Sequence, residues 1–539
     1  MDPLLLGIDV GTTGAKSALV SPEGKLQALG RSEYGIHHLR PGWVEQSPED
    51  WWQAVCLATR QAVAACPDAA ERVLGLAVSS QAPALLPLSR SGTPLRPAMI
   101  WMDRRAEAEG QKLEGALGKG SIYRITGNRP DAFYVAPKLL WFRTHEPQLL
   151  ADTFKFVQVN GYINYRLTGE YSLDWAHASL LQLRDSSTGE WNQSICRACG
   201  TDPEHFPEVR SGHEVCGVLT TTAAEATGLR AGTPVMVGTV DSAAAALEAG
   251  AAEPGVAAEM TGTSTVLVMP NREGLTEPAF IAMRHAIPDV HLLLGAMAST
   301  GACLRWFRDE LGEAEVRKAT EQNADAFDLL TGGAAQVPVG SGGVIFLPYM
   351  AGERSPLWHT QARGVIFGLS LATPRAALIR SILEGTALAL CHNVDLARKA
   401  GIPLREMRSV GGGARSALWN QIKADVLGMP IQLPQAPVGA AFGDAMLAGL
   451  GLGLYSDFSL ALRKMVKLET RFEPIRENHL KYQEVYKLFR SLYEHLRPDF
   501  DALASLPLEG GITRPDMRMR ATLNGSQRPL LHPIRRQTQ

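Results

Sequence analysis

An apolar run, a turn of glycine and hydroxyl residues and a second apolar run follow one another once in each half of the chain. The first copy spans residues 4–20 and the second spans residues 256–269. Such a pattern predicts a β-hairpin with a small, flexible turn. The turns contain Gly11, Thr12, Thr13 and Gly14 in the first hairpin, and Gly262, Thr263 and Ser264 in the second. Because turns of this kind expose backbone N–H groups, the two together could bind one polyphosphate from both sides.

Short apolar runs and longer amphipathic segments alternate through the rest of the sequence. The short runs predict strands over residues 73–78, 85–88, 98–101, 234–238, 343–349 and 407–410. The longer segments predict a helix that begins at residues 47–50, and helices over residues 242–249, 374–398, 416–427, 438–453 and 477–496. This alternation of strands and helices is typical of an α/β fold.

A short stretch of small residues, Gly250 to Gly255, separates two halves of similar style. A chain of 539 residues is long enough for two large α/β domains. We therefore expect an N-terminal lobe over residues 1–249, a hinge at the small residues, and a C-terminal lobe over residues 250–506. Residues 507–539 carry many Arg, Pro and Gln residues without periodicity, so we expect a disordered tail there.

Charge, hydropathy and cysteine usage argue against several classes of partner. The formal net charge of −2 gives no electrostatic reason to expect binding to nucleic acid or to an anionic membrane. No apolar run approaches the roughly 18 residues of a membrane-spanning helix, and the first residues lack the basic start of a secretory signal. Seven cysteines, an odd number, favour a reducing cytoplasm. Cys196 and Cys199 have the spacing of a metal site, but nothing nearby completes one, so we expect structural thiols.

Two aspartates stand at the ends of predicted strands. Asp9 lies beside the first Gly/Thr turn, where its carboxylate could hold Mg²⁺ through water molecules; the alternative is that it caps its own turn. Asp241 follows a strand and opens a helix just before the predicted hinge. The helix N-terminus favours its ionised form, so no large upward shift of its pKa is required. An ordinary N-cap is the alternative, but a position between two lobes suits a group that faces both nucleotide and acceptor.

Two further motifs are weaker signals. Residues 411–413 form a Gly-Gly-Gly turn between a strand and a helix, which permits close approach of a phosphate-bearing ligand. Trp101 and Asp103 follow another strand, where a Trp ring can stack on a sugar and a carboxylate can accept hydroxyl protons. From spacing alone, a tight turn and a core Trp followed by a capping Asp are the simpler interpretations.

In their order along the chain, these motifs resemble the FGGY family of carbohydrate kinases, and most closely its xylulokinase-like branch. The resemblance runs from about residue 4 to residue 496. The matching segments are residues 7–13, 42–46, 51–52, 101–105, 137–141, 238–244, 262–264, 347–356, 363–369 and 411–414.

The resemblance implies two actin-like, ribonuclease-H-like lobes with ATP in the cleft between them. It also implies Mg²⁺-assisted phosphoryl transfer from ATP to a hydroxyl of a small sugar, most simply a ketopentose, and it is compatible with a homodimer. Asp241 is the implied general base, and Asp9 is the implied carboxylate on the metal side. The residues implied for the nucleotide are Thr12, Thr13, Gly262, Thr263, Gly301, Gly412 and Gly413, and those implied for the sugar are Gln81, Trp101, Asp103 and Asp241.

One segment departs from the family pattern. Xylulokinases usually place Met-His-Gly after the glutamine at the end of the third strand, whereas here Gln81 is followed by Ala82-Pro83-Ala84. The missing imidazole removes an expected contact, and a buried sugar hydroxyl without a partner costs about 1–3 kcal/mol. We therefore expect an acceptor other than D-xylulose. The alternative is that Asp103 or Gln81 takes over the contact and xylulose remains the substrate.

Other functions fit parts of the sequence. The same chemistry could act on a tetritol, a hexulose or a deoxy sugar. An ATPase of the actin or Hsp70 type would couple nucleotide binding to a partner protein, but no peptide-binding β domain is recognisable. A catalytically silent sugar sensor is disfavoured because Asp9 and Asp241 are both retained.

Overall fold

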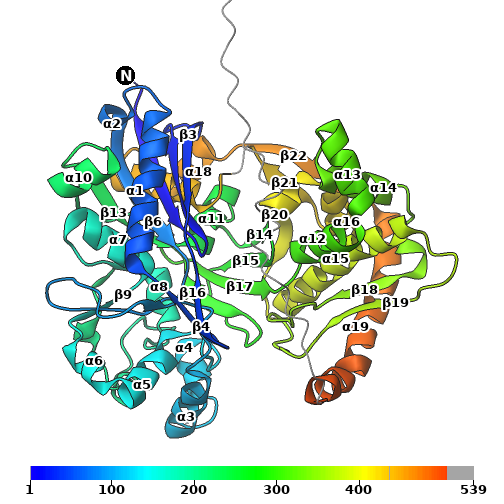
Figure 1. Cartoon of the computed structure of the whole chain (residues 1–539), viewed down its shortest axis with the longest axis horizontal. Coiled ribbons are helices and arrows are strands. Elements are labelled where there is room, and N and C mark those ends of the chain that lie inside the picture. Colours follow the sequence, from blue (N-terminus) through cyan, green and yellow to red (C-terminus); the bar gives the residue numbers. More distant parts are fainter. Residues whose placement is uncertain (1, 436–437, 507–539) are drawn as a thin grey trace, which may run out of the picture.

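Two β-sheets form the centres of two lobes (Figure 1). In this computed structural model residues 2–435 and 438–506 are described, so the predicted tail lies outside the described residues. The first sheet consists of β1 (Leu4–Val10), β2 (Gly14–Val20), β3 (Leu26–Glu33), β6 (Val73–Ser80), β12 (Val215–Val218) and β13 (Pro234–Val240). The second consists of β14 (Gly255–Thr261), β15 (Thr265–Asn271), β16 (Ile281–Arg284), β17 (His291–Met297), β20 (Leu404–Val410), β21 (Ile431–Pro434) and β22 (Leu468–Phe472).

Short strands and helices surround these sheets. Four smaller sheets contain β4 (His37–Arg40), β5 (Trp43–Gln46) and β8 (Ala98–Met99); β7 (Leu86–Leu88) and β9 (Lys155–Val157); β10 (Leu173–Asp174) and β11 (Val209–Arg210); and β18 (Ile345–Pro348) and β19 (Gly364–Phe367). The helices before residue 250 are α1 (Pro48–Ala64), α2 (Ala69–Arg72), α3 (Glu107–Leu117), α4 (Ser121–Thr126), α5 (Val135–His145), α6 (Pro147–Asp152), α7 (Val159–Thr168), α8 (Trp175–Leu180), α9 (Gln193–Cys199), α10 (Thr221–Thr227) and α11 (Asp241–Ala249). Those after it are α12 (Gly301–Leu311), α13 (Glu313–Gln322), α14 (Ala326–Ala334), α15 (Arg375–Lys399), α16 (Ala417–Leu427), α17 (Ala440–Gly451), α18 (Phe458–Met465) and α19 (Arg476–Ser505).

The two large sheets share one topology. In the first, β3, β2 and β1 pair antiparallel, β6 and β13 follow as parallel strands, and β12 closes the edge antiparallel. In the second, β17, β15 and β14 repeat the antiparallel part, β20 and β21 the parallel part, and β22 the closing strand. The α/β class, the two lobes and both predicted hairpins are thus confirmed, and the hairpins occupy equivalent places in the two sheets.

Some predicted elements have different lengths. The strand predicted over residues 98–101 is limited to Ala98–Met99, and the one over residues 343–349 to Ile345–Pro348. Helix α19 continues through Pro498 to Ser505, well beyond the predicted end at residue 496. Most of its last residues are exposed, where solvent can satisfy the carbonyl group that a proline leaves without a donor.

Helix α17 comes from the second half of the chain but packs on the first sheet. Leu5, Ala77 and Met236 of that sheet share one apolar cluster with α17 and α18. Helix α17 also crosses α11 so closely that a Cβ atom at Gly443 would lie 2.0 Å from the Ala244 carbonyl oxygen. Residues 440–465, which we expected to belong to the C-terminal lobe alone, therefore complete the core of the N-terminal lobe.

The same crossing explains Gly7 in the middle of β1. A Cβ atom there would lie 1.7 Å from the Ala441 carbonyl oxygen and 2.8 Å from the Ala445 nitrogen. We expect Gly7→Ala to lower the free energy of unfolding by about 1–3 kcal/mol, measured by denaturant titration, because α17 must move away. Gly35→Ala is the matched control, since a Cβ at Gly35 meets no atom within 4 Å. Equal stability of the two variants would contradict this account of the packing.

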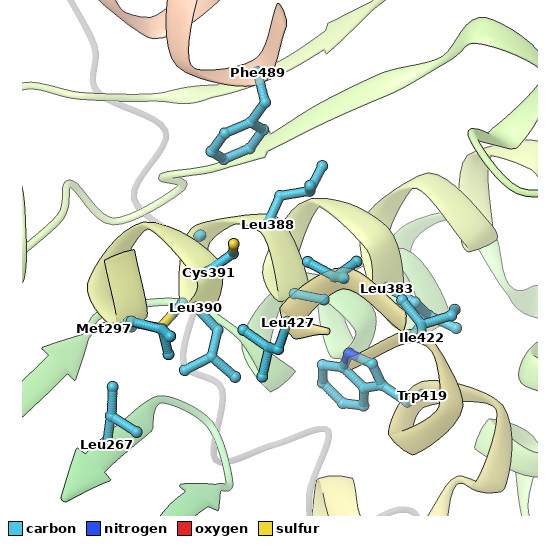
Figure 2. Packing of buried hydrophobic residues seen from close by; sticks show 14 of the residues in the cluster. Leu267, Met297, Leu383, Leu388, Leu390, Cys391, Trp419, Ile422, Leu427 and Phe489 are labelled. Carbon is cyan, nitrogen blue, oxygen red and sulfur yellow. The ribbon is translucent and has the colours of Figure 1, made fainter. Parts of the chain in front are cut away.

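The second lobe has its own core under α15 and α16. Trp419, Ile422 and Leu427 of α16 lie beside Leu383 and Leu390 of α15, as Figure 2 shows. Phe489 of α19 covers the other side of α15 in the same cluster. This packing fixes β20 and the glycine turn that follows it. Among the helices of the described residues, none is both long enough and apolar enough to span a membrane.

Candidate active site

Asp9 lies near the end of the central strand β1, on the same side of the sheet as two partners. Lys16 of β2 and Ser79 of β6 are paired in register with Asp9. The Lys16 Nζ atom lies 3.8 Å from the Asp9 Oδ2 atom, and the Oδ1 atom is buried without a hydrogen-bond partner among the described residues. Burial raises the pKa of Asp9, and the charge of Lys16 opposes this shift. Asp9 therefore has an oxygen available for a cation.

Asp241 is the first residue of α11, directly after β13. Its Oδ1 atom accepts a hydrogen bond of 2.6 Å from the Ser242 nitrogen, but Val240 is the N-cap and no side chain caps this helix, so Asp241 is not an ordinary N-cap. Burial, and next the negative charge of Asp9, nevertheless raise the pKa of Asp241 to about 7. The sequence alone led us to expect no large upward shift of this pKa. The shift is present because the cost of desolvating the carboxylate is larger than its stabilisation by the helix N-terminus. A carboxylate with this pKa suits a general base near neutral pH.

The first Gly/Thr turn is held in place by hydrogen bonds from three elements. Tyr34 donates to the Gly11 carbonyl oxygen. Gln46 donates from Nε2 to the Thr12 carbonyl oxygen at 2.7 Å, and the Trp101 Nε1–H group donates to Thr12 Oγ1 at 3.1 Å. Thr13 remains exposed. The turn is therefore rigid on its inner side and open on the side that a phosphate would approach.

The second turn touches two other glycine segments. A Cβ atom at Gly301 would lie 2.0 Å from the Gly262 carbonyl oxygen, and the Ala302 nitrogen donates to the Thr263 carbonyl oxygen at 2.9 Å. On the other side, Gly411 and Gly413 pack against Thr261, while Gly412 is exposed. The structure thus brings together every residue that was predicted for the nucleotide in the second lobe, in a cradle that side chains would fill.

Two of the residues predicted for the sugar lie beside the first turn. Gln81 donates from Nε2 to Gln46 Oε1 at 2.6 Å, and its own Oε1 atom is buried without a partner among the described residues. Trp101 contacts the turn through its indole nitrogen, and the Arg354 guanidinium of the second lobe lies 5.4 Å from the centre of its ring. Trp101 therefore contacts Thr12 directly, whereas Gln81 is connected to it through Gln46.

Asp103 differs from the other predicted sugar residues. Its side chain is fully buried. The Oδ2 atom accepts from the Val44 nitrogen at 2.6 Å, and both oxygens accept from the Arg105 guanidinium. Arg105 also pairs with Glu45. Asp103 thus forms part of a buried ion cluster, and its oxygens are engaged by the protein itself. The alternative in which Asp103 replaces the missing imidazole would require this cluster to open.

A buried network behind Gln81 was not predicted from the sequence. His177 of α8 contacts Asp174 through Nδ1, and its Nε2 atom lies 3.2 Å from Ser80 Oγ. Asp174 also accepts a hydrogen bond from Thr239 Oγ1 at 3.3 Å. The network connects the strand ends that precede Gln81 and Asp241, and the charge of His177 lowers the pKa of Asp241. An Asp three residues before a His, at the start of a short helix, is the sequence signal that could have found it.

Asp444 is a second functional candidate that the sequence analysis missed. It lies on α17, fully buried, and its Oδ2 atom accepts from Ser79 Oγ at 2.6 Å. Burial raises the pKa of Asp444, and the charges of Asp9 and Asp241 act in the same direction. A single acidic residue within an Ala/Gly-rich apolar helix was the available signal. Asp444 thus places a third carboxyl group under the sheet face that carries Asp9.

The residues present fit a nucleotide with a bound divalent cation. The described residues contain no group of three or more His, Cys, Asp or Glu side chains that could hold a metal ion by themselves. Mg²⁺ keeps several water ligands and shares phosphate oxygens, so one carboxylate with a free oxygen is sufficient. Asp9 has such an oxygen. Cys196 and Cys199, by comparison, are free, buried thiols on α9.

Two ribonuclease-H-like lobes, each with a Gly/Thr turn at the equivalent place in its sheet, and a carboxylate at their junction define a two-lobed small-molecule kinase. The chain belongs to the FGGY family of carbohydrate kinases: the N-terminal domain of that family matches residues 4–248, and its C-terminal domain matches residues 257–452. The chain is therefore a carbohydrate kinase.

Curated relatives and a solved structure agree with this assignment. The chain is 32% identical over 500 residues to the xylulose kinase of Escherichia coli (strain K12), covering 92% of this chain and 99% of that protein. It is 27% identical over 507 residues to the gluconokinase of Bacillus subtilis (strain 168), covering 94% and 98%. The crystal structure of xylulose kinase from Rhodospirillum rubrum has a TM-score of 0.84 and 30% identity, covering 92% of this chain and 100% of the other.

The pKa of Asp241 leads to an expected pH dependence. If Asp241 accepts the proton of the acceptor hydroxyl, only its ionised form is active, so kcat/KM should fall as the pH decreases through about 7. Lys16 and His177 oppose the shift, whereas Asp9 increases it, so the apparent pKa belongs to the coupled aspartate pair. The measurement is a pH profile of kcat/KM at saturating Mg²⁺. An acid limb at the ordinary aspartate pKa of about 4 would contradict the assignment.

Proposed function

We propose that this chain transfers the γ-phosphoryl group of ATP to a hydroxyl of a ketopentose, with Mg²⁺ as the metal ion. The observation that carries the proposal is the position of Asp241. It stands at the junction of the lobes, and its pKa responds to Asp9 on one side and to His177, behind Gln81, on the other. Phosphoryl transfer depends mainly on positioning and charge stabilisation, which this arrangement supplies.

In the proposed reaction each residue has a separate task. Asp241 accepts the proton from the acceptor hydroxyl. Thr12 and Thr13 on one side, and Gly262 and Thr263 on the other, offer backbone N–H groups to the phosphates. Lys16 adds a positive charge next to Asp9. The Mg²⁺ ion, when bound, neutralises charge on the phosphate oxygens.

Gln81 and Trp101 would orient the sugar, while Gly301, Gly412 and Gly413 would leave room for the nucleotide. Asp103 would act indirectly, because its ion cluster with Arg105 supports the segment that carries Trp101. A cytoplasmic location and a homodimeric state stay predictions.

The test is an ADP-release assay with ATP and a panel of acceptors: pentuloses, hexuloses, tetritols, deoxy sugars and gluconate. The proposal expects the highest kcat/KM with a ketopentose. The change at Gln81-Ala82-Pro83-Ala84 still predicts that D-xylulose is not the best of them. ATP hydrolysis that no acceptor stimulates would contradict the kinase proposal and favour an ATPase of the actin or Hsp70 type. Acceptor binding without turnover would favour a sensor.

An aldonate is the second candidate acceptor. Arg354 lies over Trp101, and the charge of the neighbouring Glu353 acts on its guanidinium. A guanidinium beside Trp101 could bind the carboxylate of an acidic sugar, and one relative of the chain is a gluconokinase. A higher kcat/KM for gluconate than for every ketopentose in the same panel would establish this alternative.

Closure of the lobes about Gly250–Gly255 is a further prediction. Both glycines have positive φ angles, 69° and 102°, while Ala251 and Ala252 are buried. The segment is therefore packed, and rotation would be absorbed by the two glycines. We expect the radius of gyration from small-angle scattering to decrease when acceptor and a non-hydrolysable ATP analogue bind together. An unchanged radius would argue against closure.

A further inference from the structure

A recess lined by two arginines lies between the lobes, formed by residues that the proposed reaction does not use. One wall comes from α8 and the turn over residues 184–189, and the other from β16, β17 and the turn over residues 274–276. Helix α8 and strand β16 pack side by side there (Figure 1). The recess is open to solvent, and the cavity volume within it is about 30 Å³.

Two arginines from opposite walls converge in this recess. Arg184 donates from Nη2 to the Gly189 carbonyl oxygen, and the Arg284 Nη2 atom lies 3.2 Å from the position of a Cβ atom at Gly189. Neither guanidinium forms an ion pair with a carboxylate of the described residues, although the charge of Glu190 acts on Arg184. The Arg184 Nε atom and the His291 Nδ1 atom, also in the recess, are buried without hydrogen-bond partners there. The recess therefore contains two buried nitrogen atoms that a ligand could contact.

Carboxylates near the recess form no ion pair with these arginines. Asp185 lines the recess and is held in its own turn, where Oδ1 accepts from the nitrogens of Ser187 and Thr188. Burial and then repulsion by Arg284 lower the pKa of Arg184, and the charge of Glu190 opposes this only in part. Burial and Arg284 likewise lower the pKa of His291, against the charge of Asp289. An anion that contacts both guanidinium groups would reduce the repulsion between these two like charges in a partly buried site.

We propose that this recess binds a small phosphate-bearing anion at a second site, separate from the candidate active site. Arg184 and Arg284 would each present N–H groups to its oxygens, since a guanidinium fork matches phosphate geometry. Two hydroxyl groups in the walls of the recess already have hydrogen-bond partners. Ser179 accepts from the Arg284 nitrogen at 3.1 Å, and Thr276 accepts from the Tyr123 hydroxyl at 3.2 Å. The anion is either inorganic phosphate or the phosphate group of a small monoester.

Binding at this site would act on both lobes at once. Asn128 of the first lobe accepts from the Ala282 nitrogen at 2.8 Å and donates to its carbonyl oxygen at 2.9 Å, so β16 is attached to the first lobe beside the recess. Helix α8 carries Ser179 toward the recess and His177 toward Ser80. An anion bridging Arg184 and Arg284 would therefore stabilise one arrangement of the lobes and change the KM of the acceptor.

The test is isothermal titration of the full chain with inorganic phosphate and, separately, with ribose 5-phosphate, in the presence of a saturating ATP analogue that occupies the phosphate turns. We expect saturable binding, weakened at least about tenfold in Arg284→Gln because a charged hydrogen-bond donor is lost. Arg284→Lys should bind with intermediate affinity. Arg308→Gln, an arginine that pairs with Asp309 on α12, is the matched control and should bind like the unmodified chain.

The two ligands separate the possible sources of the anion. Tighter binding of inorganic phosphate identifies the free ion, and tighter binding of ribose 5-phosphate identifies a monoester. Absence of saturable binding with both ligands would overturn the proposal, and so would equal affinity of Arg284→Gln and the unmodified chain. The melting temperature of each variant without ligand shows whether it is folded, and Arg184→Gln gives a second variant if Arg284→Gln is not. The titration measures binding and needs no turnover. Its outcome therefore does not depend on whether the kinase proposal is correct.

Discussion

Replacement of Asp241 by asparagine is expected to reduce kcat by about 10²–10⁴-fold, the usual effect of losing a general base. The amide has nearly the shape of the carboxylate and can still accept the hydrogen bond from the Ser242 nitrogen. It cannot accept the proton of the acceptor hydroxyl. The measurement is steady-state turnover at saturating acceptor and ATP, with ATP affinity measured in parallel. The loss should appear in kcat and leave ATP affinity nearly unchanged.

The control for this variant is Asp499→Asn, which changes an exposed aspartate on α19. It should retain the activity of the unmodified chain. Near-normal turnover of Asp241→Asn would remove Asp241 from the role of general base. In that case Asp444, a further carboxyl group whose pKa is raised by burial and by Asp9, would be the next residue to test.

Replacement of Asp9 by asparagine is expected to lower kcat/KM for Mg·ATP by about 10–100-fold, as for other residues that orient a metal ion. Asp9 has a buried oxygen without a partner and a lysine at 3.8 Å, so it is placed to balance a cation beside the phosphates. The decisive measurement is the Mg²⁺ dependence of activity, which should move to higher concentration. Acceptor binding without nucleotide, measured by isothermal titration, should change little.

The opposite result would assign Asp9 to the acceptor site instead of the metal site. Weaker acceptor binding together with an unchanged Mg²⁺ dependence would show that Asp9 contacts the sugar. Lys16→Gln serves as the companion variant, because it removes the neighbouring charge without touching the carboxylate. This variant should bind ATP more weakly and should still require Mg²⁺ for activity.

Much of the fold was predictable from local pattern. The two hairpins combine largely buried strands with short turns of glycine and hydroxyl residues, so their positions could be read from residues 4–20 and 256–269. The two lobes, the α/β class and the kinase family followed from the order of such motifs. Asp9 and Asp241 were identifiable because each stands at the end of a strand, where a parallel sheet places functional groups.

What could not be predicted depends on contacts between distant segments. Asp103 has the spacing of a sugar ligand, but Arg105 and Val44 engage its oxygens, and no local pattern reveals that. His177 gains its position from Ser80, almost a hundred residues earlier in the chain. The pKa of Asp241 depends on burial and on Asp9, which the sequence places far away.

Helix α17 also determines when the first lobe can finish folding. The ribosome releases β1, β2 and β6 early, but the apolar face of that sheet around Leu5, Ala77 and Met236 is only partly covered until residues 440–465 have been made. Most of the chain must therefore be synthesised while this face is incomplete, and a fragment that ends at residue 249 would expose it permanently. The N-terminal half should consequently need either a chaperone or the separately supplied C-terminal half to remain soluble.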